Sequence, residues 1–259
     1  MNNLHPQAQP FFIPGSTQQA LLFLHGFTAS PSEVRPVAER INKINNCSVS
    51  SILLPGHGTT PEQLDAVQWP DWYEAVEEEL QSLQARFEQV FVGGLSMGGL
   101  LALHAGITLP GLAGVVTINA PIYYHYAIIP VVSDLKGLIT PFYHKKGLSE
   151  IKKLESQGRF AYRVMPLKAF HSLNYLRKIV MHEVQDLKIP ALIFQSILDE
   201  SVHPRSADYL YEKTRQQGSR MLLLTQSRHI ATMGAQQEMI AQEIASFMEN
   251  QRNSIKNDI

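Results

Sequence analysis

The stretch VGGLSMGGLLAL, residues 92–103, places Ser96 among four glycines. A β-branched and apolar run ends at this serine, and a leucine- and alanine-rich helical pattern begins directly after it. A strand that turns abruptly into a helix strains its junction residue and holds that side chain clear of the sheet. The flanking positions must then be small, as Gly94 and Gly98 are. The stretch therefore predicts a G-x-S-x-G elbow that presents the Ser96 hydroxyl as a nucleophile.

The rest of the chain repeats this strand-then-helix pattern. Helical patterns start near residues 31, 70, 99 and 235, and the short β-rich runs between them are residues 20–24, 49–54, 90–95, 113–119, 191–198 and 221–225. Strands that alternate with helices are typical of a mainly parallel sheet covered on both faces. The sequence therefore predicts a single α/β domain over residues 1–259, with a central sheet flanked by helices.

One interval breaks the pattern. About 70 residues separate the strands that end near residue 119 and begin near residue 191, whereas a helical crossover needs about 30. We expect an insertion over residues 121–187. Its first part, residues 122–143, is rich in Tyr, Ile, Val and Leu. Some of those side chains would form an apolar roof over an acyl chain, and others would form the core of the insertion itself. The sequence does not show which residues have which role.

Two local predictions concern the start of the first helix and the C-terminal tail. Ser30 has the position of a helix N-cap, with Pro31 as the first helical residue and Glu33 closing a capping box. At the other end of the chain, residues 251–259 are expected to be frayed.

A serine nucleophile needs a base, and the base needs an acid that orients it. In this architecture the chain order is serine, acid, histidine, each at the carboxyl end of a strand. Of the seven histidines after Ser96, only His229 falls just past the last strand and before the last helix. Asp199 directly follows the strand predicted at residues 191–198, with Glu200 as the alternative acid, whereas Asp186 would lie at the opposite edge of the sheet.

The same edge of the sheet should also provide an oxyanion hole. Residues 25–27 follow the first parallel strand, and Met97 follows the nucleophile. The backbone N–H groups of Phe27 and Met97 are the predicted donors. Phe27, with Gly26, is also expected to line the substrate pocket. His25 is expected to shape this loop rather than to transfer protons.

The composition indicates which kinds of binding partner to expect and in which compartment the protein works. A net charge of −1 gives no reason to expect nucleic acid or an anionic membrane, and the charged fraction is an ordinary 17%. The single Cys47 cannot form an internal disulfide. The first residues lack a signal-peptide pattern, and no run approaches the roughly 18 apolar residues of a membrane helix. We therefore expect a cytoplasmic protein that acts on a small molecule without stable membrane association.

Several motifs together carry a family resemblance. In order along the chain they are PFFIPG, LLFLHGFTASPSEVRPVAE, LLPGHGTTPEQL, DWYEAVEEE, VGGLSMGG, VVTINAPIYY, LDESVHP and SRHIATM. The series resembles bacterial carboxylesterases and monoacylglycerol lipases of the α/β-hydrolase superfamily over nearly the whole chain, most weakly across residues 125–185.

This resemblance implies a set of roles and a kind of site. It implies Ser96, Asp199 and His229 as the triad, and Phe27 and Met97 as the oxyanion donors. It also implies that residues 121–187 form a cap over the pocket and that no metal or organic cofactor is needed. One departure is visible, because Arg228 stands where members often carry glycine before the catalytic histidine.

The resulting prediction is a carboxylesterase that cleaves esters of short-to-medium acyl chains through an acyl-enzyme. A monoacylglycerol lipase, which differs in its glyceryl leaving group, is the main alternative. An acyltransferase would use the same residues while excluding water, and a catalytically inactive ligand-binding homologue would not need the intact triad. The sequence leaves open whether the protein is a monomer or a homodimer.

Overall fold

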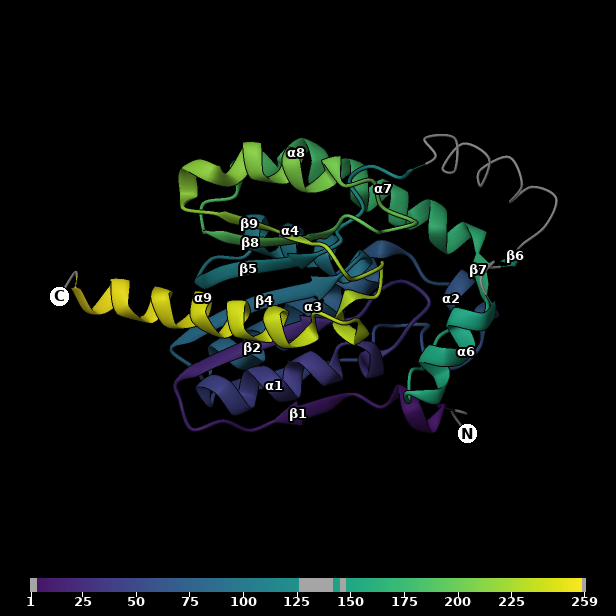
Figure 1. The fold of residues 1–259 in the computed structure, drawn as a ribbon, viewed down its shortest axis with the longest axis horizontal. Helices are drawn as coiled ribbons and strands as arrows, with labels where there is room; N and C mark the ends of the chain where they lie inside the picture. The colour runs from purple at the N-terminus through teal and green to yellow at the C-terminus, as the bar shows by residue number, and fades with distance from the viewer. Residues whose placement is uncertain (1–3, 126–141, 145–147, 258–259) are drawn as a thin grey trace.

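A computed structural model describes residues 4–125, 142–144 and 148–257, and these form one seven-stranded sheet with helices on both faces (Figure 1). The strands of this sheet are β1 (Phe11–Ile13), β2 (Gln19–Leu24), β3 (Ser48–Ser51), β4 (Gln89–Leu95), β5 (Leu112–Ile118), β8 (Ala191–Ser196) and β9 (Arg220–Leu224). Their spatial order is β1-β3-β2-β4-β5-β8-β9. Only the β1–β3 pair is antiparallel within this sheet. The predicted mainly parallel α/β sheet is confirmed.

Burial of both faces of the sheet explains why its strands read as continuous apolar runs. Every residue of β2 is buried. Successive side chains of a strand point to opposite faces, so Leu22 and Leu24 enter one core while Leu21 and Phe23 enter the other. A strand covered on both sides needs apolar residues at every position, and this is typical of parallel sheets.

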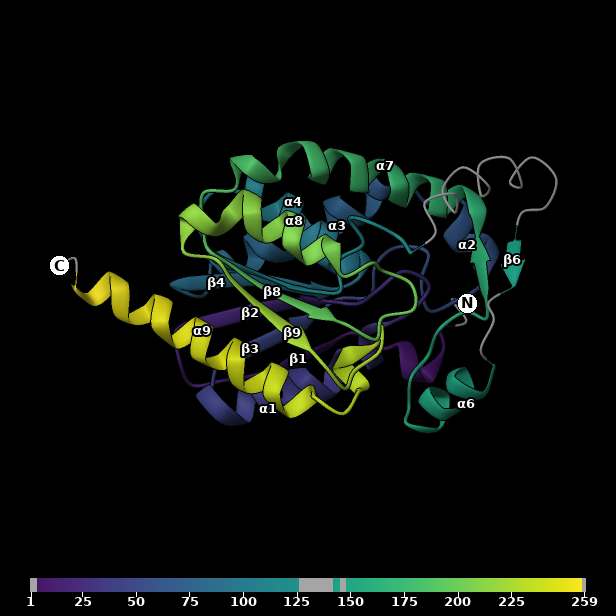
Figure 2. The same cartoon turned by 45° about the horizontal axis from the view of Figure 1, so that its top comes forward.

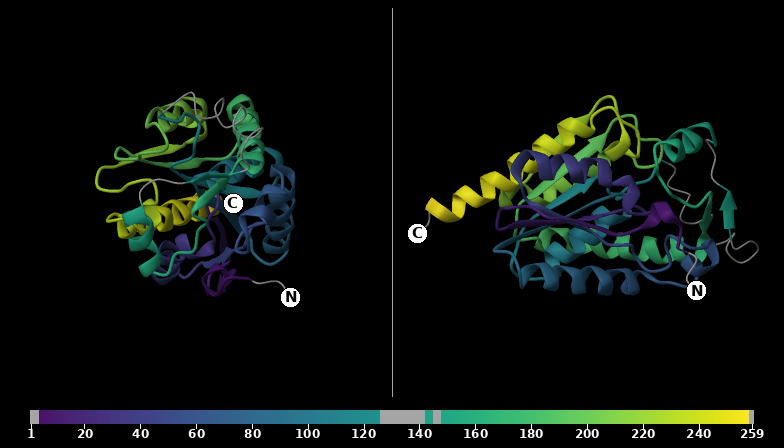
Figure 3. Two further views of the ribbon diagram at one scale, coloured as in Figure 1. Left: turned by 90° about the vertical axis from the view of Figure 1, so that its right-hand side faces the viewer. Right: turned by 90° about the horizontal axis from the view of Figure 1, so that it is seen from below.

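The helices complete two layers around the sheet (Figures 2 and 3). Described in chain order, they are α1 (Arg35–Asn45), α2 (Pro61–Asp65), α3 (Trp69–Gln84), α4 (Met97–Thr108), α6 (Leu148–Ser156), α7 (Leu167–Glu183), α8 (Arg205–Thr214) and α9 (Gln237–Asn257). One face is covered by α1 and α9, and the other by α3, α4, α7 and α8. The carboxyl ends of the parallel strands face right in Figure 1, toward α2 and α6.

The long interval between β5 and β8 contributes to two parts of the molecule. A short antiparallel pair, β6 (Phe142–His144) with β7 (Val164–Pro166), lies beside α2 at the strand ends (Figure 1). By contrast, α7 packs against α3 and α4 within the helical layer. The predicted apolar roof falls largely on residues 126–141, which lie outside the described residues.

The structure adds one short helix and corrects two local predictions. The added helix is α2, in the loop after β3, which begins with Thr60 as N-cap and Pro61 at its first position. The tail predicted to be frayed instead continues α9 to Asn257. The capping box at Ser30 is absent, because Pro31–Glu33 form a 3₁₀ turn and α1 begins only at Arg35. Glu33 is therefore not in the helical position from which it could cap.

Candidate active site

Ser96 occupies the sharp turn between β4 and α4. Its backbone has φ 55° and ψ −116°, in the left-handed range that disfavours a side chain. A Cβ atom on Gly94 would collide with the backbone of Gly98, and one on Gly98 would collide with the carbonyl oxygen of Leu24. The two glycines therefore let the helix close directly onto the strands, and the predicted elbow geometry is present.

The structure brings the three predicted site residues together from the ends of three strands. His229 Nε2 lies 3.1 Å from Ser96 Oγ, and His229 Nδ1 lies 2.8 Å from Asp199 Oδ2. The alternative acid, Glu200, accepts only a long hydrogen bond of 3.4 Å from the His229 backbone N–H. The imidazole is therefore bridged between Ser96 and Asp199, as a serine hydrolase requires.

The electrostatics of the pair suit a base that takes a proton from the serine. Burial by itself would raise the pKa of Asp199, but His229 and the N–H groups of Ser201 and Val202 outweigh it and lower the pKa. Burial by itself would lower the pKa of His229, but the carboxylates of Asp199, Glu200 and Glu33 together outweigh it, Asp199 most, and raise the pKa above its ordinary 6.5. Asp199 is therefore held ionised, and the imidazolium formed during reaction is stabilised.

The two predicted oxyanion donors belong to the loop after β2 and to the first residue of α4. Among the described residues, neither the Phe27 nor the Met97 backbone N–H has an acceptor. Met97 is the first residue of α4, so no intrahelical acceptor is available to it. The Gly26 carbonyl accepts from Ala29 N–H at 3.2 Å and lies 2.9 Å from His25 Nδ1. Because C=O and N–H of one trans peptide point in opposite directions, Phe27 N–H is directed away from those partners.

Two buried histidines hold the loop that carries Phe27. His25 Nε2 accepts from Leu54 N–H, and His57 Nε2 accepts from Thr28 N–H, both at 3.2 Å. Burial lowers the pKa of His25, so its ring is neutral and can accept this hydrogen bond. These contacts support the expected loop-shaping role of His25.

Glu33 reaches the same loop, although sequence reasoning assigned it to a helix cap. Its Oε1 accepts from Gly26 N–H at 2.6 Å, and its Oε2 lies 2.9 Å from a terminal guanidinium nitrogen of Arg159. The Glu33 side chain is fully buried. The glutamate of the predicted capping box therefore provides a carboxylate that holds the loop carrying Phe27.

Asn119 is a second residue that sequence reasoning missed. Its Nδ2 donates to the His229 carbonyl at 2.8 Å, and its Oδ1 accepts from Ser196 N–H at 2.7 Å. Ser196 Oγ in turn donates to the Arg228 carbonyl at 3.0 Å. This buried network joins the ends of β5, β8 and β9 and fixes the loop that carries His229. The available signal was an asparagine directly after a strand, here with φ 50°.

Aromatic side chains form one wall beside the oxyanion loop. The Phe27 ring lies 5.9 Å from that of Trp72 and 6.1 Å from that of Phe170, and Phe170 lies 6.0 Å from Tyr124, centroid to centroid. Trp72 is buried and donates to the Pro55 carbonyl, so it anchors α3. Phe27 itself is half-buried at this wall.

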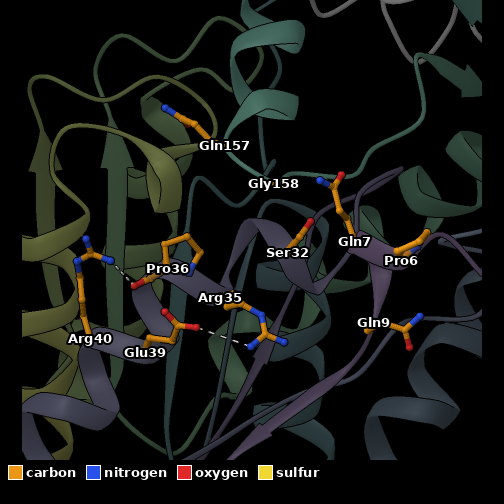
Figure 4. Close-up of a pocket in the computed structure, with 10 residues that line it drawn as sticks. All are labelled: Pro6, Gln7, Gln9, Ser32, Arg35, Pro36, Glu39, Arg40, Gln157 and Gly158. Carbon is orange, nitrogen blue, oxygen red and sulfur yellow. Dashed lines mark hydrogen bonds and ion pairs between the residues drawn. The ribbon is translucent and has the colours of Figure 1, made fainter.

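A surface hollow of about 290 Å³ lies away from these residues (Figure 4). Its lining includes Gln7, Ser32, Gln157 and two arginines of α1. Both arginines are engaged within that helix, since Arg35 pairs with Glu39 and Arg40 donates to the Pro36 carbonyl. The triad residues do not line this hollow.

Among the described residues, no helix combines the length and apolar character needed to cross a bilayer. Within the same residues, no three His, Cys, Asp or Glu side chains gather in a way that could hold a metal ion.

A strained serine elbow, a Ser–His–Asp arrangement and two free N–H donors define a serine hydrolase site on an α/β-hydrolase fold. The model of the family described as serine aminopeptidase, S33 (Hydrolase_4) matches residues 15–233. The chain belongs to this family of α/β-hydrolases.

Named relatives cover nearly the whole chain. A thermostable monoacylglycerol lipase from Bacillus sp. (strain H-257) is 32% identical over 93% of this chain and 94% of its own length. A carboxylesterase from Bacillus subtilis (strain 168) is 24% identical over 93% of this chain and 96% of its own. A solved structure from work on LipS and LipT, two metagenome-derived lipolytic enzymes, is 28% identical with a TM-score of 0.85, covering 96% of this chain and all of that one. The resemblance inferred from the motifs is confirmed.

Proposed function

We propose that the protein hydrolyses carboxylic esters through an acyl-enzyme formed on Ser96. The observation that carries this proposal is the pair of hydrogen bonds of His229, 3.1 Å to Ser96 Oγ and 2.8 Å to Asp199 Oδ2. Together these bonds join a nucleophile, a base and an orienting acid. The names of the two near-full-length relatives, which are ester-cleaving enzymes, support the same class of substrate.

In the first half-reaction, Ser96 Oγ attacks the ester carbonyl carbon while its proton passes to His229 Nε2. The carbonyl oxygen becomes an oxyanion that accepts hydrogen bonds from Phe27 and Met97 N–H. Collapse of this intermediate breaks the bond to the alcohol oxygen, which leaves with the proton from His229. A water molecule then repeats the sequence on the acyl-enzyme and releases the carboxylic acid.

The proposed substrates are esters of short-to-medium acyl chains. The aromatic wall around Phe27 favours apolar acyl groups, and each buried CH₂ contributes about 0.8 kcal/mol until the pocket is full. A monoacylglycerol lipase is the second candidate, favoured by the higher identity to a relative of that name, 32% against 24%. Both candidates use the same chemistry and differ in the alcohol that leaves.

We further propose that residues 121–187 include the cap over this pocket and that the enzyme works in the cytoplasm. Segment 159–162 of the interval contacts the oxyanion loop, which supports a cap that adjoins the site.

The single cysteine takes no part in the proposed reaction. Cys47 is fully buried, and burial raises the pKa of its thiol to about 12, so it behaves as an inert core residue.

The test compares kcat/KM for p-nitrophenyl esters of increasing acyl length with that for a long-chain monoacylglycerol at equal, sub-micellar concentration. We expect the simple esters to peak at short-to-medium length and to match or exceed the monoacylglycerol. A preference above about tenfold for the monoacylglycerol, with diacylglycerol rejected, would select the lipase, and this corresponds to about 1.4 kcal/mol. Absence of turnover on every ester would refute the proposed class.

A further inference from the structure

A buried ion pair links the oxyanion loop to the long interval between β5 and β8. Arg159, which precedes β7, donates from Nε to Glu33 Oε2 at 3.0 Å, and a terminal nitrogen lies 2.9 Å from the same oxygen. The side chains are 9% and 0% exposed. Burying two charges is costly, and such a pair often adds little net stability over apolar residues. Its position suggests a role other than stability.

The Glu33 carboxylate directly orients the residue before the oxyanion donor. Glu33 Oε1 accepts from Gly26 N–H at 2.6 Å, and charge-assisted hydrogen bonds of this kind are strong. A Cβ atom placed on Gly26 would lie 2.9 Å from that oxygen and 3.5 Å from Ser96 Cβ. Gly26 is therefore confined between the carboxylate and the nucleophile. Any shift of Glu33 would tilt the Gly26–Phe27 peptide, whose N–H is the proposed donor.

Further hydrogen bonds join the same two segments, which we call the seam: residues 26–33 against residues 159–162. Tyr162 N–H donates to the Thr28 carbonyl at 2.8 Å, and Phe160 N–H donates to Ser32 Oγ at 3.0 Å. Outside the seam, Tyr162 OH also donates to the Gly56 carbonyl at 3.0 Å, in the loop after β3. Ser32 of the seam and the adjacent Gly158 both line the hollow of Figure 4.

Charge balance explains why the seam needs an arginine. A buried carboxylate near the nucleophile would oppose the negative charge that develops on the substrate oxygen. Arg159 neutralises Glu33 while leaving Oε1 bonded to Gly26 N–H. The loop thus keeps a strong orienting hydrogen bond without adding net negative charge beside the oxyanion hole.

We propose that Glu33 and Arg159 are positioning residues that hold Phe27 N–H toward the oxyanion, so that segment 159–162 controls the geometry of the oxyanion hole. This inference rests on the proposed ester hydrolysis. It assigns part of the transition-state stabilisation to a residue of the interval between β5 and β8.

The test uses the variants Glu33→Gln, Arg159→Met and Arg159→Lys of the full chain. The matched control is Arg163→Met, because Arg163 lies four residues further on and forms an ion pair with Glu155 while 59% exposed. For each protein, kcat and KM are measured on a p-nitrophenyl ester. The inhibition constant Ki is measured for an aliphatic trifluoromethyl ketone, whose serine adduct carries a real oxyanion.

Loss of one oxyanion donor lowers kcat by about 10²–10³. A misdirected donor should therefore lower kcat by about 10–100-fold in Glu33→Gln and Arg159→Met, with KM within about threefold of wild type. Ki should rise by the same factor as KM/kcat, because the inhibitor reports on oxyanion binding. Arg159→Lys should recover part of the loss, and Arg163→Met should match wild type.

The outcomes separate this inference from the proposed function. If wild type neither turns over esters nor reacts with a fluorophosphonate, the proposed function fails. If wild type is active and the folded Glu33 and Arg159 variants keep full kcat and an unchanged Ki, the positioning role is overturned. A changed KM with unchanged Ki also overturns it. If Glu33→Gln does not fold, the two Arg159 variants decide, since they keep the Glu33 carboxylate and change only the group that holds it in place.

Discussion

The two sides of the proposed oxyanion hole are built in different ways. The Met97 side belongs to the elbow, where residues 94–98 set the geometry within one turn of the chain. The Phe27 side depends on Glu33, which lies just past the loop, and on two residues farther along the chain, His57 and Arg159. One donor is fixed by local sterics, and the other by hydrogen bonds and charges that meet only in the folded protein.

This difference has consequences for how each side tolerates change. Steric exclusion at the elbow involves backbone atoms, which cannot move without shifting β4 or α4. The polar support of the Phe27 side can be weakened one group at a time. We therefore expect substitutions of the elbow glycines to lower the stability of the whole fold and substitutions around Phe27 to lower activity in graded steps.

The largest effect is expected at the nucleophile itself. Ser96→Ala removes the covalent step while leaving the elbow backbone unchanged, so kcat should fall by on the order of 10⁴-fold or more. Ester turnover and circular dichroism of the variant check this. A fluorophosphonate should label wild type once, on the peptide that contains Ser96. Retention of more than about a tenth of the activity, or an adduct elsewhere, would contradict the assignment.

A smaller loss is expected when the acid is neutralised. Asp199→Asn should retain the fold but favour the wrong imidazole tautomer, lowering kcat by up to about 10⁴-fold. Glu200→Gln is the matched control and should stay within a few-fold of wild type. Near-normal rates in Asp199→Asn with collapse in Glu200→Gln would transfer the acid role to Glu200.

The same variant should change the pH profile. His229 acts as a base only when neutral, and its pKa is raised, so wild-type kcat/KM should fall as pH drops through a value above 6.5. Removing the Asp199 carboxylate leaves the burial that lowers this pKa. The acid limb of Asp199→Asn should therefore lie at lower pH than that of wild type, and an unshifted limb would argue against their coupling.

The smallest effect, measured in stability, concerns the elbow glycines. A Cβ atom in Gly98→Ala would meet the Leu24 carbonyl oxygen, which is backbone, so unfolding free energy should fall by about 1–3 kcal/mol. In the matched Gly99→Ala, the Cβ would lie 3.1 Å from Ala120 Cβ, and the gain in helix propensity of about 1 kcal/mol should offset the crowding. Urea unfolding measures the free energy of unfolding of both variants. Equal values for Gly98→Ala and Gly99→Ala would contradict a steric requirement for glycine at position 98.

Sequence patterns predicted best those features whose constraints are local. The elbow needed only the spacing of Gly94, Ser96 and Gly98, and the parallel sheet followed from alternating apolar runs. His229 and Asp199 were selected by their places after strands, because parallel strands end at one edge of a sheet. The short helix α2 was missed although Thr60 and Pro61 carry its start signals.

The residues that support the site were not predicted, because their roles depend on long-range contacts. Glu33 matched a capping pattern, but the 3₁₀ turn released its carboxylate toward Gly26. Arg159 lies 126 positions from Glu33 in the sequence, and no periodicity connects them. Asn119 lacked a recognisable motif for joining Ser196 to His229.

The sequence alone determined the fold class, the elbow and the order of the three site residues, because backbone sterics and strand periodicity act over a few residues. Only the tertiary structure decided which charges pair and which N–H groups stay free of an acceptor. Those outcomes depend on distances between segments that lie far apart in the sequence, as Ser96 and His229 do at 133 positions. Buried polar groups need hydrogen-bond partners, and each partner is the group that lies nearby in the folded protein, whatever its separation along the sequence.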